Sequence, residues 1–330
     1  MSRGPAGLEI RRYTDDDEAA VLGLLQASLG WLADEHHATF FRWKHVDNPF
    51  GRSPAWIALD GDRVVGLRVL LRWEFERASG GARAVRAVDT ATDPDYQGRG
   101  IFSALTMRAI EELTAEGVHF IFNTPNDQSR PGYLKMGWQV VGRLSVSARP
   151  RSPWVLTRMA GARTAADLWS TPTDAGIDPV AAFGDTQALD TLVASQPPTG
   201  GLRTRRSAAQ LRWRYAGFPA LAYRVLLRGS RLDDGFVVFR LRRRGRALEA
   251  VVGDVLVPEG ESSAAAALLR SVPRAANADY AIQLGGSVVG RAGYVPLPRQ
   301  GPVLTWRAVT EQSHGPLETW QLTLGDVELF

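Results

Sequence analysis

The segment Asp93-Pro94-Asp95-Tyr96-Gln97-Gly98-Arg99-Gly100-Ile101-Phe102 links a stretch with strand character, residues 84–92, to a stretch with helical spacing of apolar residues, 101–116. Glycine at positions 98 and 100 permits backbone angles that other residues avoid, and it lets a ligand approach closely. The free N–H groups and the dipole at a helix start favour an anion, most naturally a pyrophosphate. The same pattern also occurs in plain strand-to-helix turns, so the neighbouring segments must decide between these interpretations.

A second motif follows this turn at a suitable distance. A buried strand is predicted over residues 118–123, Asn123 and Asn126 come at its end, and the chain then reads Tyr133-Leu134-Lys135-Met136-Gly137-Trp138. Together these residues closely resemble the GNAT superfamily of acyl-CoA-dependent N-acyltransferases. In that family a bulged strand leads into Gln/Arg-x-x-Gly-x-Gly/Ala, and a later segment reads Tyr-x-Lys-x-Gly-Phe. The matching positions here are Gln97, Gly100, Tyr133, Lys135, Gly137 and the aromatic Trp138.

The elements predicted around these motifs agree with the resemblance, which covers about residues 8–148. Strands are predicted over 8–13, 56–59, 64–75, 84–92, 118–123 and 138–148, and helices over 18–29, 34–46, 101–116 and 127–136. This order mixes antiparallel hairpins with one βαβ crossover. It predicts an α/β fold in which a mixed sheet, open at one point, is flanked by helices.

The second half of the chain repeats the first weakly. Arg42-Trp43-Lys44 and Arg212-Trp213-Arg214 each close a predicted helix. Further along, Ala87-Val88-Asp89-Thr90 corresponds to Val251-Val252-Gly253-Asp254. The repeat predicts two GNAT-like mixed α/β domains in tandem.

The two halves of the tandem arrangement are expected to have different roles. Residues 1–150 are expected to be the acyl-CoA-binding catalytic domain, residues 151–180 a connector, and residues 181–330 a degenerate GNAT-like domain. Where the first half has its glycine turn, the second reads Pro258-Glu259-Gly260-Glu261-Ser262-Ser263-Ala264, and Val289 falls near the position that faces Tyr133. Two carboxylates in this turn would repel a pyrophosphate, so the chemistry is expected in the first domain only.

The resemblance implies a mechanism for the first domain. Two central strands splay apart after a bulge, and the pantetheine of acetyl-CoA fills the wedge. Backbone N–H groups of the turn hold the pyrophosphate, and an N–H of residues 89–92 polarises the thioester carbonyl. An amine attacks directly, and Tyr133 protonates the departing thiolate, for which a phenol with a pKa of about 10 is suited. The implied cofactor-binding residues are Ala91, Thr92, Gln97, Gly98, Arg99, Gly100, Ile101, Phe102 and Asn126.

Two points of this mechanism depend on single residues. Phe102 stands where the family has a small residue, and we expect its ring to turn into the core behind the helix. An acceptor ammonium must also lose a proton before it attacks. Asp89 is the first candidate for this base, and Asp93 and a chain of waters stay open beside it. Because Asp93 precedes Pro94, it is expected mainly to shape the turn.

The acceptor side is expected in residues 30–52, which are rich in aromatic residues and histidine. Its aromatic residues at helical spacing are expected in the core: Phe40, Phe41 and Trp43. No metal is expected on its histidines, because adjacent side chains of a helix point in different directions: His36, His37 and His45. The basic run over residues 240–246 is predicted to be a solvated hairpin.

Length and composition limit the number of domains and the classes of chemistry, partner and location that the chain can have. A chain of 330 residues with 45% hydrophobic and 22% charged residues is expected to form about two globular domains. The absence of cysteine excludes disulfides and an acyl-cysteine route. A net charge of +4 gives no argument for nucleic acid as a partner. No stretch has the roughly 20 apolar residues of a membrane span, and residues 1–5 lack a signal-peptide core, so a cytoplasmic location without membrane partners is expected.

The sequence therefore predicts an N-acyltransferase, most simply an N-acetyltransferase, with acetyl-CoA as co-substrate and no metal. Its partners are a CoA thioester and an amine acceptor of a small molecule or protein, and a homodimer stays open. Two alternatives remain. The tandem layout also resembles the aminoacyl-tRNA-dependent transferases that build peptidoglycan cross-bridges, although these do not need the turn over residues 97–100. The other alternative is a non-catalytic module that senses CoA or a metabolite.

Overall fold

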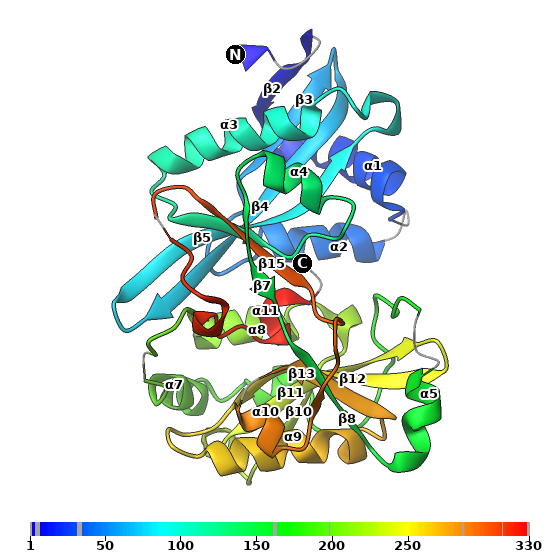
Figure 1. Ribbon diagram of the computed structural model, residues 1–330, viewed down its shortest axis with the longest axis vertical. Helices are drawn as coiled ribbons and strands as arrows, with labels where there is room; N and C mark the ends of the chain where they lie inside the picture. The colour runs from blue at the N-terminus through cyan, green and yellow to red at the C-terminus, as the bar shows by residue number, and fades with distance from the viewer. Residues whose placement is uncertain are drawn as a thin grey trace.

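The computed structural model describes residues 2–3, 7–31, 35–160, 164–197, 199–285, 287–311 and 313–328. It has two mixed α/β bodies, drawn one above the other in Figure 1, each with its own sheet and covering helices. Residue 34 of the predicted second helix and residues 161–163 of the predicted connector lie outside this description. The predicted fold class, two mixed sheets flanked by helices, is confirmed.

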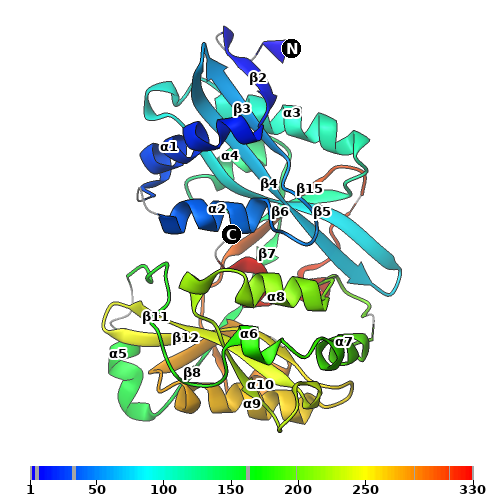
Figure 2. The same cartoon turned by 180° about the vertical axis from the view of Figure 1, so that it is seen from behind.

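Within the described residues, the first sheet has nine strands. In chain order they are β1 (Ser2–Arg3), β2 (Glu9–Arg12), β3 (Ala55–Asp60), β4 (Arg63–Arg77), β5 (Gly80–Thr92), β6 (Phe120–Asn123), β7 (Gln139–Arg143), β9 (Arg203–Thr204) and β15 (Val303–Ala308). The helices of this body are α1 (Glu18–Leu29), α2 (Glu35–His45), α3 (Ile101–Ala115) and α4 (Arg130–Lys135). Alternation along β4 places Leu67 and Val69 in the core with α1, whereas Leu70 packs in the core with α3. The helices therefore cover both faces of the sheet (Figures 1 and 2).

The second sheet has six strands in the part of the chain that the structure describes. They are β8 (Val146–Pro150), β10 (Arg224–Leu227), β11 (Phe236–Arg244), β12 (Ala247–Leu256), β13 (Tyr280–Leu284) and β14 (Val295–Pro296). Its helices are α5 (Leu156–Ala160), α6 (Pro179–Ala182), α7 (Thr186–Ala194), α8 (Ala208–Ala216), α9 (Ser262–Ala275), α10 (Ser287–Arg291) and α11 (Leu324–Val327). Short 3-10 turns lie at Asp15–Asp17, Pro94–Tyr96, Pro153–Val155, Pro219–Leu221, Leu232–Asp234 and Leu317–Thr319.

The two sheets share one strand plan. The order β3-β4-β5-β6-β15-β7 in the first corresponds to β10-β11-β12-β13-β8-β14 in the second. Each has one parallel pair at the same place, β5 with β6 and β12 with β13, and the other pairs along these six strands are antiparallel. A register shift also falls at the same point, opposite Arg68 in the first sheet and at Gly253 in the second. The weak repeat in the sequence thus corresponds to a repeated topology.

The bodies exchange their last strands. β8 follows β7 in the chain but pairs with β13 and β14 of the second sheet. β15 follows β14 but lies between β6 and β7 of the first sheet. The predicted strand region over residues 138–148 is therefore divided between two sheets, and the sheets cross the expected domain limits at residues 150 and 181. Only contacts distant in sequence decide this pairing, so local pattern carries no signal for it.

A hydrophobic core extends across the junction of the bodies. Trp43 of α2 and Trp213 of α8 stack at 5.2 Å, and each indole N–H donates to the other residue's carbonyl oxygen at 2.7 Å. Figure 2 shows these two helices facing each other between the bodies. The aromatic residues expected in the core, Phe40, Phe41 and Trp43, are all buried, as predicted.

The basic run over residues 240–246 lies in a hairpin as predicted, because Arg244 of β11 pairs with Ala247 of β12, but it is only partly solvated. Alternate arginines of β11 turn inward, and Arg240 is fully buried. Arg240 and Arg242 pair with Glu328 near the chain end, and Arg242 and Arg244 pair with Glu249. These arginines therefore join strands and the C-terminal segment of the second body rather than form a solvated basic face.

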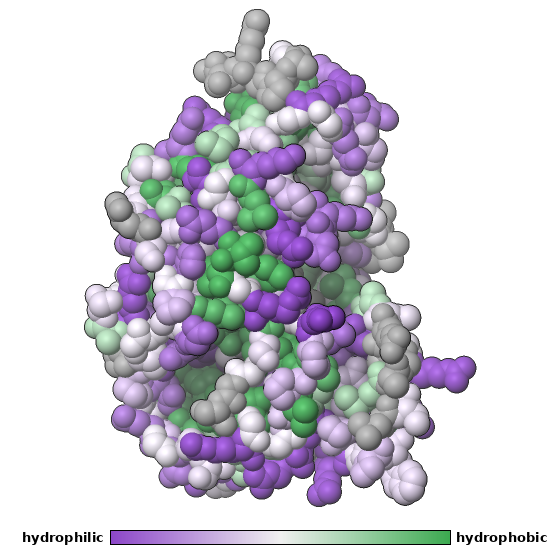
Figure 3. All heavy atoms as spheres, viewed as in Figure 1, coloured by the Kyte–Doolittle hydropathy of each residue, from purple (hydrophilic) through white to green (hydrophobic). Residues whose placement is uncertain are grey.

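Apolar side chains also gather on part of the surface. Figure 3 shows them near the middle of the molecule, in the region where Figure 1 draws β7 and β15. β7 ends the strand order of the first sheet, and its Val140 is 49% exposed. This strand therefore presents an open edge with an apolar side chain.

The glycine at position 66 allows α3 to pack closely on β4. A Cβ atom at this position would lie 2.5 Å from Ile101 Cγ2 and 3.2 Å from Leu105 Cδ1. We expect Gly66→Ala to lower the free energy of unfolding by about 1–3 kcal/mol, as overpacking of a core does. Urea unfolding measures this change. Gly23→Ala is the matched control, because Gly23 lies within α1 with nothing near its Cβ position, and it should stabilise by about 0.5–1 kcal/mol. Equal effects of the two substitutions would contradict this packing.

Candidate active site

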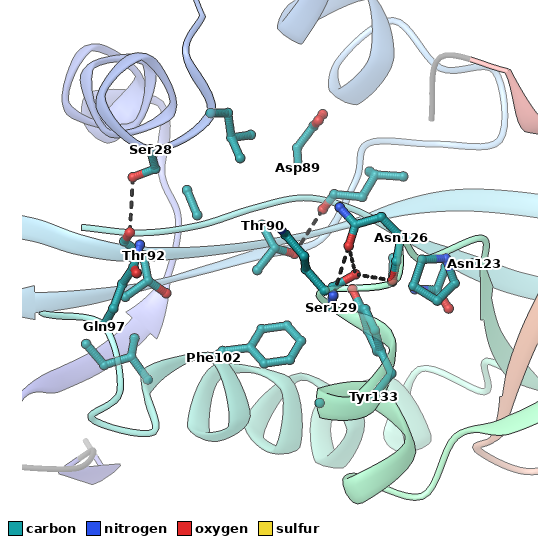
Figure 4. A pocket seen from close by; sticks show the side chains of 18 of the residues that line it. Ser28, Asp89, Thr90, Thr92, Gln97, Phe102, Asn123, Asn126, Ser129 and Tyr133 are labelled. Atoms are coloured by element: carbon teal, nitrogen blue, oxygen red, sulfur yellow. Dashed lines mark hydrogen bonds between the residues drawn. The ribbon is translucent and has the colours of Figure 1, made fainter. Parts of the chain in front are cut away.

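A cavity of about 800 Å³ lies where β5 and β6 separate. The two strands pair only from Ala84 opposite Phe120 to Arg86 opposite Phe122, and β5 continues to Thr92 without β6 beside it. One wall of the cavity is formed by residues 87–92 of β5, and another by residues 123–126 after the end of β6. The predicted splaying of two central strands is thus present, and Figure 4 shows the side chains around it.

The separation begins at a bulge. Leu67 pairs with Ala91 and Val69 with Val88, so Arg68 of β4 faces two residues of β5, Asp89 and Thr90. Asp89 has a φ of 39°, which is unusual for a residue with a side chain. The extra residue turns Asp89 toward α2 and leaves Thr90 on the side of α3, and Figure 4 shows Asp89 and Phe102 on opposite sides of this strand.

The glycine turn opens α3 at the edge of the cavity. Gly98 and Gly100 have φ values of 75° and 78°, where a Cβ atom is strained, and Gly100 directly precedes the first helical residue. The first N–H groups of a helix have no partner within it. The turn residues among the cavity lining are Tyr96, Gln97, Gly98, Gly100, Ile101 and Phe102. Arg99 is not among the lining residues, and its guanidinium donates to the carbonyl oxygen of Asp95 at 2.9 Å.

Tyr133 and Asn126 reach the cavity from the segment after β6. Tyr133 is buried, and its hydroxyl oxygen accepts a hydrogen bond from Arg68 Nη1 at 2.8 Å. Asn126 also lines the cavity, and its Oδ1 accepts from the N–H and the hydroxyl of Ser129, which directly precedes α4. Ala91 and Thr92 complete the lining on the β5 side. With the exception of Arg99, the residues predicted for catalysis and for cofactor binding therefore meet in one cavity.

The comparisons with known proteins agree with this geometry. Residues 9–141 match the family model described as the acetyltransferase (GNAT) domain. This part of the chain is a GNAT acetyltransferase domain. The class of enzyme is thereby an acyltransferase, as predicted.

Solved structures of similar fold extend over most of the chain. The chain is similar to a GCN5-related N-acetyltransferase from Kribbella flavida, with 19% identity, a TM-score of 0.62, and coverage of 92% of this chain and 71% of that one. It is also similar to a probable N-acyltransferase from Enterococcus faecalis, with 11% identity, a TM-score of 0.63, and coverage of 92% of this chain and 73% of that one. A third similar structure is Eis1 from Mycobacterium abscessus, with 15% identity, a TM-score of 0.56, and coverage of 92% of this chain and 73% of that one. These likenesses cover both bodies, so the fold of the second body is shared with these structures too.

Phe102 lies differently from the expectation. It does not turn into the core behind α3; it lines the cavity of the GNAT domain, and its ring meets that of Tyr133 edge to face at 5.3 Å. Gly132 is part of the reason, since even a Cβ atom there would come within 3.3 Å of the Phe102 ring. The ring therefore forms part of the wall beside the tyrosine.

Asp89 is the centre of a buried polar cluster that the sequence did not reveal. Its Oδ2 contacts Lys44 Nζ and accepts from His45 Nε2 at 2.8 Å, while Ser53 lies 2.9 Å from His45 Nδ1. Lys44 and His45 are almost fully buried. A neutral imidazole that donates from Nε2 accepts at Nδ1. His45 can therefore donate to the carboxylate of Asp89 and accept from the hydroxyl of Ser53.

This cluster fixes the charge of Asp89. Burial alone would raise the pKa of Asp89, but the charge of Lys44 and the hydrogen bond from His45 outweigh it and hold that pKa well below its ordinary value. Burial lowers the pKa of His45 more than Asp89 raises it, so the imidazole is neutral at pH 7. Asp89 is therefore a carboxylate that takes up a proton less readily than an ordinary aspartate.

The cluster makes a prediction for stability. We expect Lys44→Met to lower the free energy of unfolding by about 3–5 kcal/mol at pH 7, because it leaves a buried carboxylate without its cation. A depressed pKa stabilises the folded state above the unfolded value of about 3.9, and this contribution is lost as the pH falls below it. The loss caused by Lys44→Met should therefore shrink below about pH 4. Urea unfolding of Lys44→Met and of Lys135→Met, the exposed lysine, tests this; equal stabilities of the two variants would contradict it.

The remaining candidates have clear positions. Asp93 is buried and accepts from the N–H of Asp95 at 3.0 Å and from Arg63 at 2.6 Å, so it shapes the turn as expected. It is not among the residues that line the cavity. His36 and His37 lie against the ring of Trp169. Within the described ranges of the chain, no group of three or more His, Asp or Glu residues has the arrangement of a metal site, and no helix is long and apolar enough to cross a membrane.

The surroundings of the end of β12, the strand that corresponds to β5, are different in the second body. The cavity beside the end of β12, lined by Asp254, Val255 and Leu256 among others, has a volume of only about 160 Å³. Arg206 pairs with Asp254 there, and Tyr215 donates to the same carboxylate. In the turn before α9, Glu261 lies 3.3 Å from Arg228. An ion pair and a tyrosine hydroxyl thus surround Asp254 near the end of β12, the strand that corresponds to β5.

Proposed function

We propose that the GNAT domain transfers an acetyl group from acetyl-CoA to an amine by direct attack. The observation that carries this proposal is the convergence of the Gly98–Gly100 turn, the bulge of β5 and the Tyr133 hydroxyl on one cavity. A volume of about 800 Å³ is in the range of cavities that bind small molecules and cofactors.

Each wall of the cavity has a part in the proposed reaction. The N–H groups at the start of α3 bind the pyrophosphate of CoA, and Gln97, Phe102 and Asn126 line the path of the rest of the cofactor. The N–H groups of residues 89–92, with Ala91 and Thr92 at the end of the strand, polarise the thioester carbonyl and stabilise the oxyanion. The amine nitrogen bonds to the carbonyl carbon, the C–S bond breaks, and Tyr133 gives its proton to the sulfur.

The proton of the acceptor ammonium leaves by another route in this proposal. Asp89 is a weak proton acceptor because Lys44 and His45 hold its pKa low. Its Oδ1 is not part of either hydrogen bond, and the residue lines the cavity. We therefore assign Asp89 the role of orienting the ammonium, while water removes the proton.

The second body has a supporting role in this proposal. It contributes β15 to the first sheet, and its own turn carries Glu259 and Glu261 where a pyrophosphate would have to bind. We propose that it binds no CoA, and that residues 181–330 are a degenerate GNAT-like domain joined to the catalytic domain by residues 151–180. A cytoplasmic location, where acetyl-CoA is available, fits this function.

Release of the CoA thiol in the presence of a panel of amines tests the proposal. The panel should contain amino acids, polyamines, amino sugars and peptides, and mass spectrometry should identify the acetylated acceptor. The proposal requires thiol release that depends on an amine, with one acetylated product for each thiol. Binding of acetyl-CoA without turnover for any amine would favour the sensing module, and transfer from aminoacyl-tRNA without thiol release would favour the peptidoglycan-bridge type of enzyme.

A further inference from the structure

Arg68 is a buried cation in the centre of the first sheet. It lies on β4 directly opposite the bulge, and its exposed fraction is 0%. Arg240, which is also fully buried, pairs with the carboxylate of Glu328. Among the ion pairs of the described residues there is none for Arg68. A buried charge without a counter-ion is costly, so its position calls for an explanation.

The contacts of Arg68 are directed at the reaction site. Nη1 donates to Tyr133 Oη at 2.8 Å and to Thr90 Oγ1 at 2.6 Å. The guanidinium carbon lies 5.3 Å from the centre of the Tyr133 ring and 5.5 Å from that of Phe102. Nε and Nη2 are buried and have no hydrogen-bond partner. The charge is therefore surrounded by the groups that line the cavity.

The direction of the bond to Tyr133 decides how the phenol behaves. A guanidinium has donors and no acceptor, so Tyr133 Oη must accept from it. The hydroxyl hydrogen of Tyr133 therefore points away from Arg68, and Tyr133 lines the cavity. Arg68 thereby fixes the phenol as a proton donor toward the cavity.

The reaction supplies the missing counter-ion. When the C–S bond breaks, the electron pair goes to sulfur, and the proton of Tyr133 follows it. The O–H electron pair stays on Tyr133 Oη, which becomes a phenolate 2.8 Å from Arg68 Nη1 until water returns a proton. A hydrogen bond between charged groups in a water-poor site is stronger than one between neutral groups.

We propose that Arg68 is a positioning residue for Tyr133: it holds the phenol as a donor to the leaving thiolate and stabilises the phenolate that forms. This inference rests on the proposed acetyl transfer. The bulge contributes to this arrangement, because it places two residues of β5 opposite Arg68. Thr90 accepts from the guanidinium and orients it, while Asp89 turns to the other face of the sheet.

A double-mutant cycle on kcat tests the inference. We expect Arg68→Met to lower kcat about 10- to 100-fold, the range of a hydrogen bond to a charged group, with the affinity for CoA and the KM for acetyl-CoA within about twofold of wild type. Tyr133→Phe with Arg68→Met should be no slower than Tyr133→Phe alone. Arg68→Lys should recover part of the rate, since it restores a charged donor. Arg72→Met on the same strand, whose guanidinium pairs with Glu116 away from the cavity, should keep the wild-type kcat.

The outcomes separate the inference from the proposed function. If Tyr133→Phe lowers kcat and Arg68→Met does not, or if the two effects multiply in the double variant, the inference is wrong and the proposed function stands. If Tyr133→Phe leaves kcat unchanged, the proposed function fails, and the inference fails with it. Arg68→Met also removes a buried side chain and can lower stability. Calorimetric titration with CoA therefore serves as the folding control, and only variants that bind CoA with wild-type affinity are compared in the cycle.

Discussion

Tyr133→Phe is expected to lower kcat for acetyl transfer about 10²- to 10⁴-fold, the contribution of a positioned general acid. The hydroxyl is the only group removed, and the ring keeps its contacts with Phe102 and Trp138, at 5.3 and 5.1 Å. The fold and the cavity should therefore stay intact. The KM for acetyl-CoA should change little, because the lost interaction acts on the leaving sulfur and not on the bound cofactor.

Steady-state kinetics with both substrates varied, together with calorimetric titration of CoA, checks this result. Tyr294→Phe is the matched control, because Tyr294 is buried like Tyr133 but its hydroxyl donates to the carbonyl oxygen of Leu269 in the second body at 2.9 Å. It should keep wild-type kcat. A loss of CoA affinity as large as the loss of kcat would assign Tyr133 to binding rather than to proton transfer.

A fragment of residues 1–150 is expected not to fold by itself. It contains β6 and β7 but lacks β15, which pairs with both of them. It also carries β8, whose partners β13 and β14 it does not contain. Such a fragment has unpaired strand edges beside Phe120 and Phe122, which are fully buried in the whole chain, and edges of this kind favour aggregation.

Fragment complementation measures the effect of the strand exchange. Residues 1–150 and 151–330 together contain every strand, so the two fragments should yield soluble protein with cooperative thermal unfolding when they are produced together and aggregate when they are produced separately. Circular dichroism and size-exclusion chromatography distinguish these states. A fragment of residues 1–150 that unfolds cooperatively and binds acetyl-CoA alone would show that β15 is dispensable.

The parts of the fold that could be predicted from the sequence are those with local signals. Glu18–Leu29 is helical as predicted, and Ile101–Ala115 follows a glycine turn whose φ values require glycine. The strand exchange could not be predicted, because β8 and β15 have the same alternating pattern whichever sheet they join. Burial of alternate arginines in β11 was also missed, since Glu328, which pairs with Arg240 and Arg242, lies 88 and 86 positions away from them in sequence.

The candidate site shows the same limit. The turn residues and Tyr133 lie in motifs with fixed spacing, so the sequence was sufficient to bring them together. Lys44 and Arg68 act through contacts across 45 and 65 positions of the chain, to Asp89 and Tyr133. A signal was present for Arg68, because a single arginine within the apolar run of residues 64–71 is unusual for a buried strand. Its partner could be identified only once the bulge and the cavity were known.

Calorimetric titration of acetyl-CoA into the whole chain tests the central claim most directly. The claim is that one of two similar bodies has an open wedge and a glycine turn that bind acetyl-CoA, whereas the corresponding turn of the other carries Glu259 and Glu261 and binds none. It predicts a stoichiometry of one acetyl-CoA per chain. An absence of binding, or a stoichiometry of two, would contradict it.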